Sequence, residues 1–184
     1  MVRVVTGRIV LISGPPGAGK TTLARPLAER LGFALLTKDD IKEPLFTAME
    51  GEAGDAAFSR RVGAAAMEVL WALAPHCPAL VLEANFRTKS AYERGRVAAL
   101  MQGGAQIVEV HCRVPLEEAA RRFAARARDE RHHPAHVLQE MSVERLAEYE
   151  GPFGLGPVLE VDTTRPVDLE ALVARIRQLL AAAD

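Results

Sequence analysis

A glycine-rich octapeptide near the start of this chain has the residue types and the spacing to bind phosphate. Residues 14–21 of the 184-residue sequence read G-P-P-G-A-G-K-T, which matches the P-loop pattern G-x-x-x-x-G-K-[ST]. Glycines let the backbone curl so that successive N–H groups point at phosphate oxygens, and a helix that begins at Lys20 directs the positive end of its dipole at the same anion. Lys20 supplies a mobile charge to the β- and γ-phosphates, and the Thr21 hydroxyl ligates Mg²⁺. The loop predicts a nucleoside triphosphate site with Mg²⁺, and its candidate ligands are Gly14, Pro15, Pro16, Gly17, Ala18, Gly19, Lys20 and Thr21.

A second polar segment, K-D-D-I-K at residues 38–42, follows a candidate strand at Ala34–Thr37. Ligands of α/β sheets bind at the carboxyl ends of the strands, so Asp39 is expected across a crevice from the P-loop. A carboxylate in that place can orient an acceptor hydroxyl and take its proton, or complete the Mg²⁺ shell. The alternative is that Asp39 or Asp40 caps the helix that follows, and both interpretations can hold at once, with one aspartate for each role.

An acidic residue also stands near the end of the next buried strand. Residues Ala79–Ala84 read A-L-V-L-E-A, so Glu83 resembles a Walker B carboxylate, which contacts Mg²⁺ directly or through water. The alternative is that Glu83 only pairs with a nearby arginine. The metal role is favoured because an acidic group near the end of a buried strand is costly without a partner. Asn85 and Arg87 follow the strand and are candidate substrate-binding residues.

An arginine-dense segment follows the strand expected at Gln106–Cys112. Phosphoryl transfer needs cationic groups that close over the phosphates and stabilise charge in the transition state, and a hinged arginine helix supplies them while excluding water. Arg122 and Arg126 lie one turn apart on the helix expected over Leu116–Arg128. The alternative is a solvated basic face. We expect a lid over about residues 115–145, with Arg126 as a catalytic residue.

Three histidines, His132, His133 and His136, follow the arginines. A zinc site is not expected, because no carboxylate or cysteine lies at ligand spacing from these histidines and Pro134 breaks the helix that would align them. The segment is therefore expected to form a turn at the tip of the lid.

Short strands alternate with helical patterns along the whole chain. The P-loop follows an apolar strand at residues 8–13, and a fifth strand is expected at residues 158–161. Helices are expected at residues 55–74, 88–102 and 168–182 in addition to those above; the first has Asp55 as its cap and an apolar face that includes Val62, Val69 and Leu73. This alternation predicts one α/β domain over residues 1–184, in which helices cover both faces of a parallel sheet.

Composition narrows the class of protein. A hydrophobic content of 49% is ample for one core, and a net charge of −1 argues against a dedicated nucleic-acid binder. No cationic leader and no apolar run long enough to span a bilayer is present, so we expect no membrane association. Cys77 and Cys112 fall in or beside apolar segments, which is typical of reduced cysteines in a cytoplasmic protein.

Four segments together resemble one group of phosphotransferases. The segments G-P-P-G-A-G-K-T-T, K-D-D-I-K, E-A-N-F and R-R-F-A-A-R-A-R look like those of P-loop kinases that include polynucleotide 5′-kinases, zeta toxins and chloramphenicol phosphotransferase. The resemblance covers most of the chain, from the first strand to the last helix. It implies a three-layer P-loop NTPase fold with strand order 2-3-1-4-5 and an arginine-rich lid.

The resemblance also implies roles for individual residues. Asp39 takes the place of a general base, and Lys42 replaces an arginine that binds a substrate phosphate, with the loss of a bidentate fork. Thr22 reaches the α-phosphate and Arg122 lies over the adenine. The loop that contains Thr164 and Arg165 borders the base.

These observations predict an ATP- and Mg²⁺-dependent kinase that transfers the γ-phosphoryl group to a hydroxyl of a small molecule. Lys20 and the loop amides bind the phosphates, and Thr21 with Asp39 or Glu83 holds Mg²⁺. The substrate-binding candidates are Asp39, Lys42, Asn85 and Arg87. Two alternatives stay open: a polynucleotide or nucleotide kinase, and a nucleotide-dependent ATPase, regulatory or toxin-type module without such an acceptor. The oligomeric state, the acceptor and the choice between ATP and GTP are left open.

Overall fold

The five strands form one sheet in which every neighbouring pair is parallel. In the computed structural model, which describes residues 7–129 and 132–182, the strand order is β2-β3-β1-β4-β5. The order confirms the one that the sequence resemblance implied. The strands are β1 (Arg8–Ser13), β2 (Ala34–Thr37), β3 (Ala79–Glu83), β4 (Gln106–Arg113) and β5 (Val158–Asp162).

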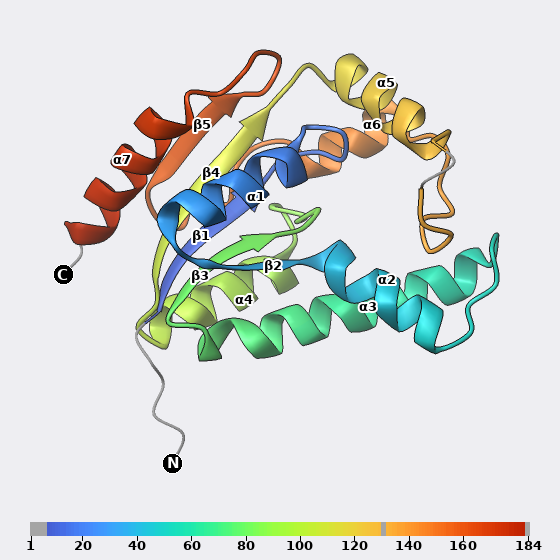
Figure 1. Cartoon of the computed structure of the whole chain (residues 1–184), viewed down its shortest axis with the longest axis horizontal. Coiled ribbons are helices and arrows are strands. Elements are labelled where there is room, and N and C mark those ends of the chain that lie inside the picture. Colours follow the sequence, from blue (N-terminus) through green and yellow to red (C-terminus); the bar gives the residue numbers. More distant parts are fainter. Residues whose placement is uncertain (1–6, 130–131, 183–184) are drawn as a thin grey trace.

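Helices cover both faces of the sheet (Figure 1). α1 (Lys20–Leu31) and α7 (Leu169–Ala181) pack on one face, and α3 (Ala56–Leu73) and α4 (Ala91–Gln102) pack on the other. The sequence of strand β1 is a continuous apolar run because its alternate side chains enter two different cores. Val10 and Ile12 are buried beneath α1 and α7, whereas Ile9 and Leu11 are buried beneath α3 and α4.

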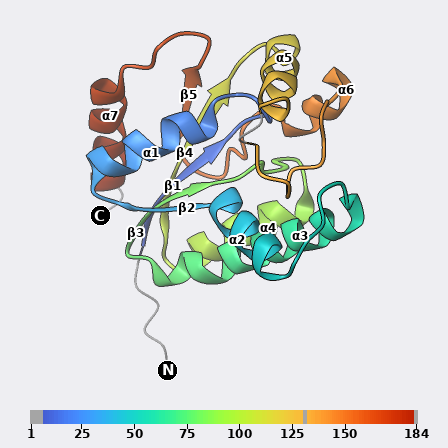
Figure 2. The same cartoon turned by 45° about the vertical axis from the view of Figure 1, so that its right-hand side comes forward.

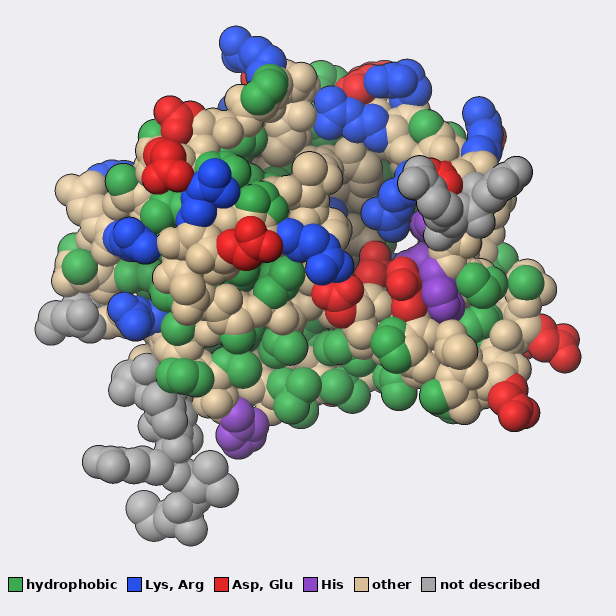
Figure 3. Space-filling view, in the orientation of Figure 1, with side chains coloured by type: hydrophobic (Ala, Val, Ile, Leu, Met, Phe, Trp, Pro, Cys, Tyr) green, Lys and Arg blue, Asp and Glu red, His purple; other side chains and the backbone are tan. Residues whose placement is uncertain are grey.

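Two groups of helices extend beyond the carboxyl ends of the strands (Figures 1 and 2). One group is α2 (Lys38–Ala48) packed on the first half of α3, and the other is α5 (Leu116–Ala127) beside α6 (Val143–Leu146). Short 3₁₀ turns occupy Ala74–His76 and Ala147–Tyr149. Figure 3 shows a hollow between the two groups, with basic, acidic and histidine side chains around it.

The start of α2 differs from the sequence prediction. Neither Asp39 nor Asp40 caps this helix, because the helix already begins at Lys38. Thr37 has an extended backbone conformation and its side-chain oxygen accepts a hydrogen bond from the Asp40 N–H at 3.0 Å, which makes Thr37 the N-cap. The two aspartates lie in the first turn, where the helix dipole favours negative charge. Asp39 is therefore not engaged as a cap.

The long helix α3 is turned relative to the expected face. Asp55 caps it as predicted, since its carboxylate accepts from the Phe58 N–H at 2.9 Å. Val62 is buried as expected, but Val69 is 38% exposed and Leu73 is 44% exposed. Ala66, which belongs to the expected face, is also buried, and Leu70 and Trp71 are buried in place of Val69 and Leu73. The apolar residues surround much of this helix, so their spacing alone could not show which face meets the sheet.

Candidate active site

The P-loop is held between a strand and a helix that come much later in the chain. Gly14 has φ +130°, and a Cβ added there would stand 2.5 Å from the backbone oxygen of Cys112 on β4. Gly17 has φ +86°, and its Cβ would stand 2.2 Å from the backbone oxygen of Ala119 on α5. Only glycine fits both the backbone conformation and these close approaches. The loop's shape therefore depends on its fit against β4 and α5.

Lys20 directs its charge into this loop. Its Nζ donates hydrogen bonds to the backbone oxygens of Gly14 and Pro15, each at 2.9 Å. The side chain is buried, and burial lowers the pKa of Lys20, while the charge of Glu83 acts in the opposite direction. A buried ammonium beside loop N–H groups is suited to bind a phosphate anion, which would compensate its charge.

Glu83 stands beside Thr21 at the end of β3. Strand pairing places Glu83 opposite Ile12 on β1 and Thr37 on β2, so it lies at the carboxyl ends of both neighbours. The Thr21 hydroxyl donates to the Glu83 carboxylate at 3.2 Å. Burial raises the pKa of Glu83, and the nearby Lys20 charge partly opposes this. A hydroxyl and a buried carboxylate next to the phosphate site are the oxygen ligands that Mg²⁺ takes together with phosphate oxygens, so these residues fit the ion.

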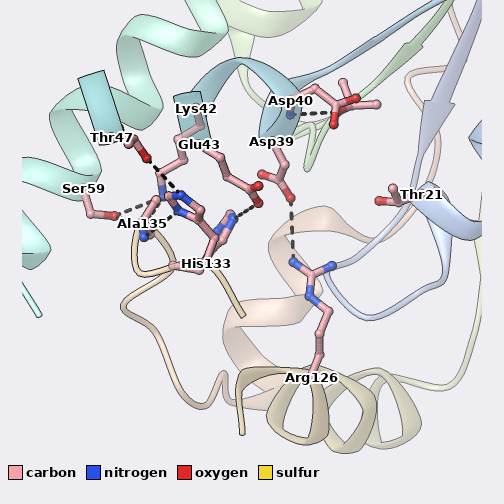
Figure 4. Close-up of polar contacts among 12 residues, drawn as sticks. Thr21, Asp39, Asp40, Lys42, Glu43, Thr47, Ser59, Arg126, His133 and Ala135 are labelled. Atoms are coloured by element: carbon pink, nitrogen blue, oxygen red, sulfur yellow. Dashed lines mark hydrogen bonds and ion pairs between the residues drawn. The ribbon is translucent and has the colours of Figure 1, made fainter. Parts of the chain in front are cut away.

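Asp39 and Arg126 face each other across the hollow (Figure 4). An Arg126 nitrogen lies 3.7 Å from an Asp39 carboxylate oxygen, and the two side chains are 54% and 29% exposed. They come from α2 and α5, so this pair joins the two groups of helices. Both are accessible to a substrate that would enter between them.

Two cavities meet at this pair. A cavity of about 270 Å³ is lined by P-loop residues together with Thr22, Glu83 and Arg122. A larger cavity of about 490 Å³ extends over α3, α6 and the segment after His132. Both cavities are lined by Pro16, Asp39, Asn85, Phe123 and Arg126. The shared wall therefore contains the carboxylate and the arginine that the sequence marked for chemistry.

Of the three residues expected near the nucleotide base, one lines the smaller cavity and two do not. Arg122 lines the smaller cavity, and its side chain donates to Glu118 at 2.7 Å and to the Thr163 backbone oxygen at 3.2 Å. Thr164 and Arg165 instead bind Asp162, at 2.6 and 3.2 Å from its carboxylate. Within the described residues, neither of these two lines the smaller cavity. Their role at the base stays a prediction.

The candidate substrate-binding residues differ in whether their side chains already have partners within the protein. Asn85 lines both cavities, and Arg87 lines the larger one, where its nitrogen lies 3.8 Å from the Glu148 carboxylate. A hydrogen bond with Tyr149 raises the pKa of Arg87. Lys42 is buried, and its ammonium donates to the Ser59 hydroxyl at 3.0 Å and to the Ala135 backbone oxygen at 2.7 Å (Figure 4). Lys42 thus ties α2 to α3 and to the segment after the histidines.

The histidines attach the same segment to α2. The His136 ring lies 2.9 Å from the Glu43 carboxylate. The His133 ring lies 3.2 Å from the Thr47 hydroxyl (Figure 4). His132 stacks on His136 and both line the larger cavity. Burial is the main cause that lowers the pKa of each of these two rings. The expected lid region also contains Glu130 and Arg131, which lie outside the described residues.

Sequence reasoning missed a buried polar network directly behind the P-loop. The Ser13 hydroxyl donates to Glu109 at 2.6 Å and lies 2.8 Å from the His111 ring. Glu109 also accepts hydrogen bonds from the backbone N–H groups of Phe153 and Gly154, at 2.9 and 3.1 Å. All three side chains are buried. The available signal was the pair of polar residues at positions 109 and 111 inside an apolar strand.

A family model described as an AAA domain matches residues 9–147. The chain belongs to this family. The chain has 28% identity and a TM-score of 0.80 to a solved structure from Chloroflexus aurantiacus J-10-fl, described as a candidate kinase, over 94% of this chain and 98% of that chain. The likeness agrees with the P-loop kinase fold that the strand order shows.

Two curated relatives match smaller parts of the chain. A shikimate kinase from Saccharopolyspora erythraea is 44% identical over 69 residues, which cover 29% of this chain and 39% of that protein. A cytidylate kinase from Ignicoccus hospitalis is 29% identical over 124 residues, which cover 64% of each. The chain therefore spans less than two thirds of the length of either relative. No helix among the described residues combines the length and the apolar character that crossing a membrane needs.

Proposed function

We propose that this AAA domain is an ATP- and Mg²⁺-dependent phosphotransferase that moves the γ-phosphoryl group to a hydroxyl of a small molecule. One observation carries the proposal: Asp39 and Arg126 lie on the wall shared by the P-loop cavity and a second, larger cavity. A bare ATPase needs only the first cavity. A phosphotransferase needs a donor site and an acceptor site that meet at the transferred group.

In the proposed reaction the acceptor hydroxyl oxygen bonds to the γ-phosphorus, and the bond from that phosphorus to the β–γ bridging oxygen breaks. The hydroxyl proton passes to the Asp39 carboxylate, and ADP leaves with the bridging oxygen. Lys20 and the loop amides bind the phosphates, and Arg126 stabilises the charge of the phosphoryl group during transfer. Thr21 and Glu83, with Asp39 near them, would hold Mg²⁺, which supplies neutralisation of phosphate charge.

The similarity to a shikimate kinase and to a candidate kinase supports this function. A cytoplasmic setting goes with it, because ATP, Mg²⁺ and reduced thiols are available there. The cytidylate kinase match, which covers more of the chain, favours a nucleotide kinase as the second candidate. The likeness to polynucleotide kinases and chloramphenicol phosphotransferase stays a hypothesis about the acceptor.

The test is the release of ADP with and without a panel of acceptors. The panel includes sugars, sugar acids, shikimate, chloramphenicol-like diols, nucleoside monophosphates and 5′-hydroxyl oligonucleotides. We expect acceptor-dependent release with a small hydroxyl compound, and loss of that release in Lys20→Ala, since the buried ammonium cannot be replaced by water in a closed site. Equal release with and without every acceptor would instead support an ATPase, and undiminished turnover by Lys20→Ala would contradict the whole site.

Asp39→Asn separates the base from the rest of the site. The amide keeps the shape of the side chain but cannot take a proton, so kcat is expected to fall by about 10²–10⁴-fold. Binding of ATP, measured by calorimetry, should change little because the phosphates contact the P-loop. Asp40→Asn is the matched control, since Asp40 faces Arg25 at 2.9 Å and lines neither of the two cavities. Retained turnover in Asp39→Asn would refute the assignment of the base.

A further inference from the structure

The larger cavity has a charge that differs from that of the whole chain. The protein has a net charge of −1, yet six cationic side chains line this cavity against two carboxylates, those of Asp39 and Glu93. Burial lowers the pKa of His132 and His136, which disfavours the charged form of both rings. The cationic residues are Lys38, Lys42, Arg60, Arg87, Arg126 and Arg145.

Three of these cations already have partners inside the protein. Arg126 pairs with Asp39, Arg87 lies beside Glu148 and Tyr149, and Lys42 donates to Ser59 and Ala135. In the described ranges of the chain, the side chains of Lys38, Arg60 and Arg145 make no close ion pair and donate no hydrogen bond to another residue, although the Lys38 charge acts on Glu93 and opposes the rise of that carboxyl's pKa. Among the six cations, these three therefore keep their side-chain donors for a ligand.

The three residues reach the cavity from separate elements. Gly63 leaves room on α3 for the Lys38 ammonium, which lies 3.7 Å from the place where a Cβ on Gly63 would stand. Arg60 precedes Gly63 by one helical turn, so it lies on the same side of α3 as that ammonium. Arg145 comes from α6, in the opposite group of helices. An anion between the two groups would be contacted from both sides.

Part of the remaining wall of the cavity is apolar. Met67 from α3, Phe123 from α5, and Val137, Leu138 and Met141 from the segment before α6 line it. Leu138 is 45% exposed, which leaves apolar surface open toward the cavity. A volume of about 490 Å³ lies in the usual range for small-molecule sites, roughly 300–1,000 Å³. The cavity thus suits a compound with a carbon framework as well as a charge.

We propose that the acceptor is itself an anion: a small hydroxyl compound with a carboxylate or phosphate group that Lys38, Arg60 and Arg145 bind. The inference rests on the proposed phosphotransferase function and names the class of its acceptor. The position of this anion site differs from that implied by the family resemblance, in which Lys42 binds the substrate phosphate. The Lys42 ammonium donates two hydrogen bonds to groups within the protein, which leaves one N–H for a ligand. The guanidinium groups of Arg60 and Arg145 can each donate two parallel hydrogen bonds to an anion.

The experiment compares acceptors that differ by one charged group. Gluconate is tested against glucitol, shikimate against its methyl ester, and glycerol 3-phosphate against glycerol, with ADP release as the readout. We expect at least one anion to be turned over with kcat/KM about tenfold or more above its neutral partner, since charge-assisted hydrogen bonds to a carboxylate or phosphate supply that difference. Whether the carboxylate or the phosphate pair responds identifies the group.

The double variant Arg60→Gln/Arg145→Gln tests the residues. We expect KM for the anionic acceptor to rise about tenfold or more with kcat and KM for ATP nearly unchanged, because the two arginines bind the acceptor away from the transferred group. Arg61→Gln is the matched control. Arg61 neighbours Arg60 on α3 but packs over the Phe58 ring, 5.4 Å from its centroid, and does not line the cavity. Calorimetric titration of the same anions, with a non-hydrolysable ATP analogue bound, gives a readout without turnover.

The outcomes separate this inference from the function on which it rests. Neutral acceptors turned over as well as the anions, or equal affinity of the double variant and the wild type for the anions, would overturn the anion site and leave the kinase proposal standing. Preferred turnover of a 5′-hydroxyl oligonucleotide over every small anion would also overturn it. If no acceptor of any kind stimulates ADP release, both proposals fall together.

Discussion

At the residue scale, the site depends on opposite charges that face each other across a gap. Asp39 and Arg126 are 3.7 Å apart at their nearest nitrogen and oxygen, and both remain partly exposed. A surface pair of this kind contributes little to stability, about 0–1 kcal/mol. Its position on the wall between two cavities therefore makes more sense as chemistry than as structural support.

Arg126→Gln should show this separation between activity and stability. We expect kcat for phosphoryl transfer to fall by about 10²–10³-fold, the usual effect of removing one group that stabilises transition-state charge. The midpoint of thermal unfolding should change by less than about 2 °C, since the ion pair is weak. Arg128→Gln is the control, because Arg128 pairs with Glu140 and lines neither cavity. A variant with normal kcat would remove Arg126 from the mechanism.

The sequence located single residues well where one local motif carries the chemistry. Thr21 and Lys20 stand where the P-loop pattern placed them, and Glu83 contacts Thr21 rather than pairing with an arginine in the described part of the chain. Lys42 shows where prediction from local motifs fails. Its partners, Ser59 and Ala135, are 17 and 93 residues away, so no spacing rule in the chain could reveal that its charge is used internally.

At the element scale, the P-loop packs between β4 and α5. The close approach of Gly17 to the Ala119 backbone links the nucleotide loop to the helix that carries Arg122 and Arg126. The buried network of Ser13 and Glu109 links the strand before the loop to the segment at Phe153. The position of the loop is thus coupled to α5 on one side and to the segment at Phe153 on the other.

Gly17→Ala should damage both stability and nucleotide binding. The added methyl group would meet a backbone oxygen at 2.2 Å in a conformation with φ +86°, so the loop or α5 must move. We expect a loss of about 2 kcal/mol, or roughly 6 °C in Tm, together with weaker ATP binding measured by calorimetry. Gly95→Ala is the control, because Gly95 lies inside α4 with nothing within 4 Å of its added Cβ. That variant should be more stable by about 0.5–1 kcal/mol. The prediction fails if the two variants behave alike.

Element boundaries followed the sequence closely, but contacts at their ends did not. The helix caps at Asp55 and Asp168 accept hydrogen bonds from the N–H groups of Phe58 and Ala171 as their residue types favour. At α2 the sequence makes Asp39 and Asp40 candidate caps, but the helix uses Thr37, which precedes both. The choice depends on where β2 leaves the sheet, since Thr37 is still paired with Glu83 in the strand register.

At the scale of the whole molecule, the two free cysteines report on different environments. Cys112 is fully buried in β4, and burial raises its pKa to about 12, whereas Cys77 is only partly buried. The thiolate is the reactive form of cysteine, so Cys112 stays inert in the folded protein. This burial follows from the position of β4 in the interior of the sheet.

A thiol reagent at pH 8 should therefore label the native chain once, at Cys77, and label both cysteines after denaturation in guanidinium. The rate at Cys112 should follow global unfolding, because β4 lies between two other strands and opens only with the core. Mass spectrometry of the labelled peptides identifies the site. Rapid native labelling of Cys112 would contradict the buried position of β4.

The sequence by itself determined the P-loop motif and the class of fold, and its resemblance to P-loop kinases implied the order of the strands. The P-loop keeps its ligands within eight contiguous residues, and alternating strands and helices leave few ways to build a covered parallel sheet. Only the tertiary structure brought together the residues of the proposed acceptor site. Lys38, Arg60 and Arg145 stand on three elements with no common spacing, and they share a cavity because α2 and α3 pack against each other on one side of the hollow and α6 lies on the other. When a site is assembled from distant segments, its residues have no fixed spacing along the chain, so the sequence alone does not reveal that they lie together.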